Sequence, residues 1–199
     1  SYILDPEGAR INTTYTEVRD TGVVKLKAEQ LVKSGTIELI IEYKAPFNTS
    51  SEGLYKSVSG DQNYIYSDLQ PLDARKFFPS FDEPRFKTPF KISVNVPSSD
   101  VAISNAPVDE TVVLKNDRKR LEFKTTKPLP TYLIALAVGD FDVVNWDPIP
   151  ANTVRSTPIP LRGIAPKGEG EKFGYALKNT EAMIEILEEY FGIPYPYAK

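Results

Sequence analysis

The sequence predicts a mostly β protein, an antiparallel β-sandwich that ends in one amphipathic helix. Three observations lead to this prediction. Apolar and polar residues alternate up to about residue 140, 17 prolines are spread through the connecting segments, and the pattern changes to a helical period only near the end. Short strands joined by proline-rich turns are typical of sandwiches and barrels.

Four segments justify the strands. Residues 36–43 (TIELIIEY) and 90–96 (FKISVNV) carry apolar side chains at every second position, which is the period of a half-buried strand. Residues 111–126 indicate a hairpin with an Asn-Asp turn. The segment 131–141 (TYLIALAVGDF) is apolar on both faces, as in a central strand that is covered on both sides.

After Trp146 the chain becomes rich in Pro and Gly, and a helical period then follows over about residues 171–191. Gly192 and Pro194 are typical of a helix end. We expect the packing partner of this helix to lie beyond Lys199, because the preceding β segments offer almost no partner for its apolar face. The apolar residues near one face are Phe173, Leu177, Ile184, Leu187 and Phe191.

The composition excludes several functions. The chain has no histidine and no cysteine, so it lacks the usual zinc ligands, a histidine base and a thiol nucleophile. A net charge of −3 argues against a nucleic-acid surface, and the basic run 115–120 is better explained as a hairpin tip. No apolar run is long enough for a membrane span. The lack of cysteine leaves cytoplasm, periplasm and extracellular space open, with the cytoplasm slightly favoured.

Five motifs in one order resemble the zinc aminopeptidases of the aminopeptidase N, puromycin-sensitive aminopeptidase and leukotriene hydrolase family, the gluzincin metallopeptidases. The signature is LQPLDARKFFPSFDEPRFKTPF at 69–90. The other four are GLYKS at 53–57, ISNAP at 103–107, YLIALAVGDFD at 132–142 and YFGIPYPYAK at 190–199. Each motif is weak alone, and their shared order carries the resemblance.

The resemblance implies a saddle-like N-terminal β-domain that leads into an α/β thermolysin-like catalytic domain with one zinc. We expect residues 1–144 to be the β-sandwich domain, incomplete at its start. Residues 145–199 are expected to begin the catalytic domain with a strand and the helix, truncated before the G-A-M-E-N and H-E-x-x-H motifs, neither of which occurs here. The segment should hold no cofactor and catalyse nothing alone. The parent enzyme would remove N-terminal amino acids from peptides.

The resemblance also implies a substrate-binding role for Gln70, whose family position sends an oxygen toward the α-ammonium of the peptide substrate. Relatives often have Gln where this chain has Asp68. A carboxylate there would attract the ammonium or a basic first side chain, and the alternative is that Asp68 simply ends a strand. We expect Gln70 and Asp68 to be the substrate contacts of this segment, which walls the active-site cleft beside the catalytic domain.

The other charges of the signature are expected to be structural. Asp73, Arg75, Asp82 and Glu83 lie among phenylalanines and prolines. Arg75 is suited to pair with a carboxylate, and Asp82 is the expected partner. Adjacent carboxylates point in opposite directions in an extended chain, so Asp82 and Glu83 do not form an acid–base pair.

A different class of function stays open beside the enzyme segment. The chain could be a stand-alone β-sandwich module for peptide or carbohydrate binding, or a scaffold relative without a zinc domain. The apolar face of the helix argues against a self-contained module, because such a module should cover its own helix.

Overall fold

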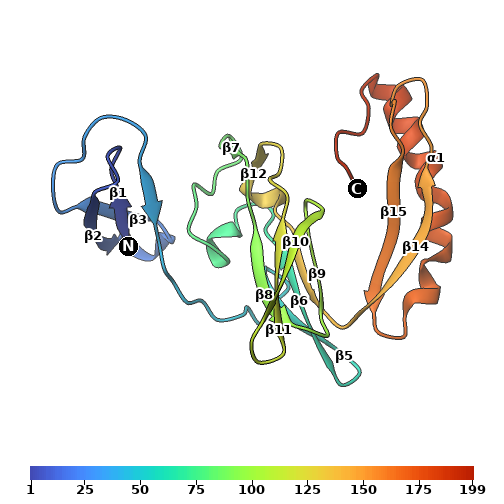
Figure 1. Cartoon of the computed structure of the whole chain (residues 1–199), viewed down its shortest axis with the longest axis horizontal. Coiled ribbons are helices and arrows are strands. Elements are labelled where there is room, and N and C mark those ends of the chain that lie inside the picture. Colours follow the sequence, from blue (N-terminus) through green and yellow to red (C-terminus); the bar gives the residue numbers. More distant parts are fainter. The chain divides into compact units, whose positions relative to one another are not determined.

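The computed structural model describes residues 1–199, which form two compact units (Figure 1). The smaller unit comprises residues 1–46 and 78–80, and the larger comprises residues 47–77 and 81–199. The chain is mostly antiparallel strand, with one α-helix near its end, so the predicted fold class is confirmed. None of its helices is long and apolar enough to cross a membrane.

The smaller unit is built on one sheet with the strand order β3-β2-β1-β4. Ile3 and Ile11 lie opposite each other in this sheet and are both buried. The strand expected over 36–43 is shorter than predicted, because its partner β1 offers only three residues for pairing. The strands are β1 (Tyr2–Leu4), β2 (Arg10–Glu17), β3 (Val24–Ala28) and β4 (Glu38–Ile40).

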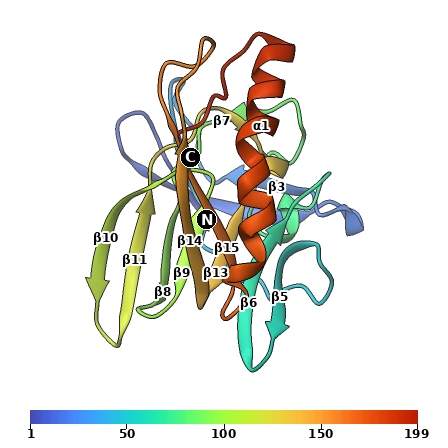
Figure 2. The same cartoon turned by 90° about the vertical axis from the view of Figure 1, so that its right-hand side faces the viewer.

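The larger unit contains two sheets that enclose a common apolar core (Figure 2). One sheet has the order β5-β6-β13-β9 and the other β10-β11-β8. Their inward residues, among them Phe123 and Val138, form the core cluster. The strands are β5 (Gly53–Ser59), β6 (Gln62–Asp68), β8 (Ser93–Pro97), β9 (Val101–Ser104), β10 (Val108–Leu114), β11 (Arg118–Phe123) and β13 (Leu136–Gly139).

The predicted hairpin is confirmed as β10 and β11. Asn116 and Asp117 form its turn with φ values of 60° and 52°, a region in which Asn and Asp are better tolerated than most residues. The basic run bonds to the neighbouring strand β8 and its end, since Arg118 Nη2 donates to Asn95 O at 2.7 Å and Lys119 Nζ to Ser98 O at 2.8 Å. These two cations therefore hydrogen-bond to backbone carbonyl groups in β8 and just after it.

The central strand expected over 131–141 is interrupted. Thr131–Leu133 form a 3₁₀ turn, which the Ile134 N–H closes by donating to Thr131 O at 3.0 Å. The strand β13 begins at Leu136 and lies between β6 and β9, so its central place was predicted correctly and its start was not. A short ladder precedes the turn, in which β12 (Leu129–Pro130) pairs with β7 (Lys87–Thr88).

A long hairpin and the helix complete the larger unit. The strands β14 (Phe141–Ile149) and β15 (Ile159–Pro166) pair with each other, and α1 (Gly174–Phe191) runs alongside them (Figures 1 and 2). The helix begins three residues later than residue 171, because Gly170–Phe173 form a 3₁₀ turn. Asp142 holds the chain before this turn by accepting hydrogen bonds from the N–H groups of Gly168 and Gly170.

The apolar face of α1 is covered only in part. Leu177 is buried, whereas Leu187 and Phe191 of the predicted face are exposed, and the charged Glu188 between them is buried. Glu188 Oε1 accepts a hydrogen bond from Arg155 Nε at 2.8 Å, and both side chains are only 3% exposed. Burial of an ion pair is tolerated only when the charged groups are hydrogen-bonded to each other and to further polar groups.

The same carboxylate joins three segments. Besides Arg155, Glu188 accepts from Asn152 Nδ2 at 2.7 Å and from the Tyr195 N–H at 2.7 Å. The Tyr195 N–H, and after it Asn152 and Arg155, lower the pKa of Glu188 against the opposing effect of burial. The tail that follows the helix is thereby held, and its Lys199 Nζ donates to the carbonyl of Ser104.

We expect Glu188→Gln to destabilise the protein in a pH-dependent way. Because folding lowers the pKa of Glu188, the stabilisation by this carboxylate is fully present above the ordinary glutamate value of 4.5 and is lost as the pH falls below it. The difference in free energy of unfolding between wild type and variant should be largest at neutral pH and shrink in acid. Urea denaturation at several pH values measures it.

The control is Glu189→Gln, which removes the same charge from the exposed neighbouring position. It should leave the unfolding free energy nearly unchanged at every pH. A constant difference between wild type and Glu188→Gln from neutral to acid pH would contradict the assigned ionisation.

Candidate functional site

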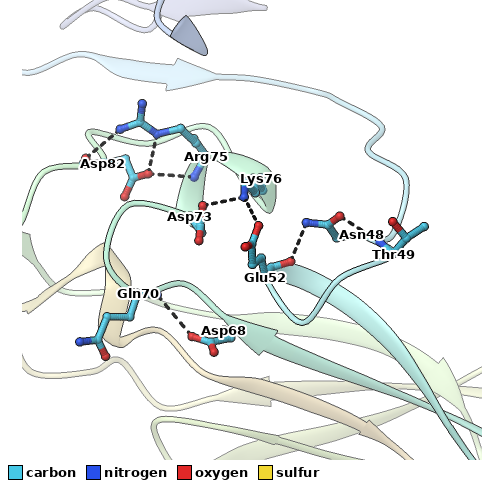
Figure 3. Close-up of polar contacts among 9 residues, drawn as sticks. All are labelled: Asn48, Thr49, Glu52, Asp68, Gln70, Asp73, Arg75, Lys76 and Asp82. Carbon is cyan, nitrogen blue, oxygen red and sulfur yellow. Dashed lines mark hydrogen bonds and ion pairs between the residues drawn. The ribbon is translucent and has the colours of Figure 1, made fainter.

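The two predicted substrate contacts lie together where β6 ends (Figure 3). Asp68 is the last residue of β6, and Gln70 follows two residues later. Both are exposed, whereas Leu69 between them is only 2% exposed. The buried Leu69 thus fixes which residues of this segment face outward. The Gln70 N–H lies 3.5 Å from Asp68 Oδ1, and the Gln70 side-chain amide has no hydrogen bond within the chain.

A tight turn carries the chain away from Gln70. The Gln70–Pro71 peptide bond is cis, and the Asp73 N–H donates to Leu69 O at 2.9 Å, which closes the turn. The 3₁₀ turn Ala74–Lys76 follows directly, with the Lys76 N–H donating to Asp73 O at 3.0 Å. Gln70 therefore sits in a turn whose two ends are joined by a backbone hydrogen bond.

Lys76 connects this turn to the start of β5. Its Nζ atom lies 2.9 Å from Asp73 Oδ1 and 2.5 Å from Glu52 Oε2 (Figure 3). The hydrogen bond to Glu52, and after it the one to Asp73, raises the pKa of Lys76. Glu52 is itself held through its backbone, since Asn48 Nδ2 donates to Glu52 O at 2.9 Å. We call Glu52, Asp73 and Lys76 the Lys76 cluster.

Gly53 allows the Lys76 cluster to form. It has a φ of +66°, and a Cβ atom added there would lie 2.6 Å from the Cβ of Lys76. Any other residue would push this loop outward and strain the backbone. Gly53 also pairs with Asp68 across the β5–β6 hairpin. The glycine of GLYKS and the signature loop are therefore parts of one packed structure.

Arg75 and Asp82 form the ion pair that the sequence suggested. Arg75 Nε donates to Asp82 Oδ2 at 2.9 Å, and the Arg75 backbone N–H donates to the same oxygen at 3.1 Å. The other carboxylate oxygen, Oδ1, accepts from Thr131 Oγ1 at 2.9 Å. The Asp82 side chain is 5% exposed, so these hydrogen bonds replace the water that burial removes.

Glu83 lies in different surroundings from Asp82. It is exposed and pairs with Arg85 at 2.8 Å, while the neighbouring Phe81 is 78% exposed. Phe81 contacts Phe86, and the Arg85 guanidinium lies over the Phe86 ring. One carboxylate is thus buried and fully bonded while the other is solvated, an arrangement without the shared site that an acid–base pair requires.

Four residues of this region were not singled out from the sequence: Glu52, Lys76, Thr131 and Asn48. Asp73 and Lys76 are three residues apart, a spacing that brings side chains together in a helical turn, and this signal could have suggested their pairing. The contacts with Glu52 and Thr131 join residues 24 and 49 positions apart, and nothing in the local pattern indicates them.

The exposed groups of this site carry oxygen acceptors, but they do not fit a zinc ion. Asp68 and Gln70 offer a carboxylate and an amide oxygen to solvent, which suits a small ammonium group. Zinc requires closely placed nitrogen, sulfur or carboxylate ligands. The chain has neither histidine nor cysteine, and no group of three or more acidic side chains is placed to hold a metal ion.

Comparison with known proteins identifies the family. A family model described as the peptidase M1 N-terminal domain matches residues 5–133. The chain belongs to the peptidase M1 N-terminal domain family. The match includes the whole region of Figure 3, so Asp68, Gln70 and the Lys76 cluster are all part of the M1 N-terminal domain.

Several relatives of this M1 N-terminal domain are named aminopeptidases. It is 32% identical to aminopeptidase N of Acetobacter pasteurianus over 98% of this chain and 53% of that protein. It is 34% identical to aminopeptidase M1-A of Oryza sativa subsp. japonica over 92% of this chain and 20% of that protein. Aminopeptidase A of Gloydius brevicauda is also 34% identical, with 88% and 18% covered. The chain thus spans about half of one relative and about a fifth of the others.

We expect Gly53→Ala to lower the free energy of unfolding by about 2–4 kcal/mol, from backbone strain together with the clash against Lys76. Gly60→Ala is the matched control, because Gly60 has a φ of +57° but no atom within 4 Å of the added Cβ. It should cost only about 1 kcal/mol. Equal losses in the two variants, measured by urea denaturation, would show that Lys76 does not constrain position 53.

We expect Arg75→Ala to lower the free energy of unfolding by about 1–3 kcal/mol, because Asp82 would stay buried without its cation. Arg85→Ala removes an exposed guanidinium from the same loop and should cost less than about 1 kcal/mol. Thermal and urea denaturation compare the two. An Arg75→Ala protein as stable as wild type would contradict the structural role.

Proposed function

We propose that this chain is the N-terminal part of a zinc-dependent aminopeptidase that removes N-terminal amino acids from peptides. In this proposal residues 1–144 form the β-domain, and residues 145–199 begin the catalytic domain. The chain walls the active-site cleft and supplies an anchor for the substrate α-amine. The zinc and the hydrolytic groups belong to the catalytic domain. The family match and the names of the relatives support this assignment.

The outward placement of Gln70 beside Asp68 is the single observation that carries the anchor role. The Gln70 amide is exposed and has no hydrogen bond within the chain, on a turn whose backbone is closed at 2.9 Å. An acceptor that the protein itself leaves free is available to a ligand, and a fixed backbone reduces the entropy lost on binding.

The proposed chemistry of the anchor is recognition of a free N-terminus. The α-ammonium of a peptide donates hydrogen bonds to Gln70 Oε1 and to the Asp68 carboxylate. A blocked or internal peptide lacks this cation and leaves the acceptors unpaired, which costs binding free energy. Asp68 adds a negative charge, so it also favours substrates with a basic first side chain.

The exposed face of α1 supports the proposed start of a further domain. Large apolar side chains stand along it at helical spacing, and a solvent-exposed patch of this kind is typical of a surface that packs against protein. It argues against the alternative of a stand-alone β-sandwich module. These residues are Tyr175, Met183, Ile186, Leu187, Tyr190 and Phe191.

In the full-length enzyme we expect Gln70→Ala to lower kcat/KM for peptide substrates by about 5- to 100-fold, as the loss of a hydrogen bond to a charged group would. Asp68→Asn should lower kcat/KM more for substrates with a basic first residue than for those with an apolar one. Steady-state kinetics on both substrate types test this. Unchanged kcat/KM in Gln70→Ala would disprove the anchor.

A further inference from the structure

We propose that the Lys76 cluster positions Gln70 and thereby sets the affinity of the enzyme for the substrate α-amine. The inference rests on the proposed anchor function of Gln70. It assigns a positioning role to Glu52, Asp73 and Lys76, which act without contacting the substrate themselves. Lys76 acts through the turn that carries Gln70, so it is a positioning residue.

The backbone and the side-chain contacts of this region form a closed loop that includes Gln70. Gly53, which follows Glu52, is paired with Asp68 across the hairpin. From Asp68 the chain continues through Leu69 and Gln70 to Asp73. The Lys76 ammonium then bridges Asp73 at 2.9 Å and Glu52 at 2.5 Å, which returns the loop to its start (Figure 3). Gln70 lies in the part of this loop between Asp68 and Asp73.

The Lys76 cluster adds a side-chain restraint at the Asp73 end of the turn. Within it, the Asp73 N–H bond to Leu69 O and the burial of Leu69 fix one side. The Gln70 side-chain amide makes no hydrogen bond within the chain, so the backbone from Leu69 to Asp73 determines from which point, and in which direction, this side chain projects. A displacement of about 1 Å in a substrate-positioning group is enough to reduce catalysis severalfold or more.

The cluster is more than an incidental surface ion pair. Lys76 contacts two carboxylates, and the Asp73 side chain is 19% exposed, against 40% for Lys76 and 54% for Glu52. The close approach of Lys76 to Gly53 fixes the base of the lysine side chain. The hydrogen bond to Glu52, and after it the one to Asp73, raises the pKa of Lys76, so both contacts favour its protonated form. A network held at both ends retains its geometry better than an isolated exposed pair.

The test is a set of variants of the full-length enzyme. Lys76→Met removes the charge but keeps most of the length of the side chain, and Glu52→Gln weakens the second contact. We expect each to raise KM for peptide substrates about 3- to 10-fold with a smaller change in kcat. Lys76→Arg should restore most of the affinity, because it can bridge the same carboxylates. The matched control Lys172→Met breaks the exposed pair with Glu169 and should leave KM unchanged.

A double-mutant cycle separates positioning from general destabilisation. If Lys76 acts through Gln70, Lys76→Met should have little further effect on KM in a Gln70→Ala background, so the two changes are not additive. Hydrogen exchange of the Asp73 amide should also become several times faster in Lys76→Met, because the turn opens more often.

The outcomes are distinct. Wild-type KM in Lys76→Met beside an impaired Gln70→Ala would overturn the positioning role and leave the anchor in place. Additive effects in the cycle would likewise overturn it, since Lys76 would then act independently of Gln70. Wild-type kinetics in Gln70→Ala would overturn the anchor itself, and the positioning role with it, even if Asp73 exchange were faster.

Discussion

The buried carboxylate of Asp82 is the interaction on which the signature loop depends. Asp82 is 5% exposed, and its two oxygens bond to Arg75 on one side and to Thr131 on the other. Thr131 begins the turn that leads into the central strand β13. A single charge therefore determines both how the loop closes and how it joins the sandwich. Because Asp82 is almost inaccessible to water, the loss of either partner would leave a buried charge with fewer hydrogen bonds.

Local pattern predicted much of this fold. The Asn-Asp turn of the β10–β11 hairpin follows from turn chemistry, and the central place of β13 follows from a segment that is apolar on both faces. Strand limits did not follow, because β4 is as short as its partner β1 and β13 starts only after a 3₁₀ turn. In α1, the burial of Glu188 was not predicted. Its partners Arg155 and Asn152 come from a distant loop, which periodicity cannot reveal.

The candidate site shows a similar division. The motif resemblance directed attention to Gln70 and Asp68, and the structure places both outward at the end of β6. The pairing of Arg75 with Asp82 followed from the chemistry of a charged residue among aromatics. The contact between Lys76 and Glu52 did not, since it depends on the close approach of two segments at Gly53.

The register of the β5–β6 hairpin has a consequence for how this domain tolerates insertions and deletions. Gly53 pairs with Asp68 at one end, and Ser59 pairs with Gln62 at the other, so the register between these two pairs fixes the length of both strands. One residue gained or lost within either strand would turn every later side chain to the opposite face. Asp68 would then point inward and Leu69 outward. Length changes are therefore expected only in the tip at Gly60 and Asp61, where the register of the two strands is unaffected.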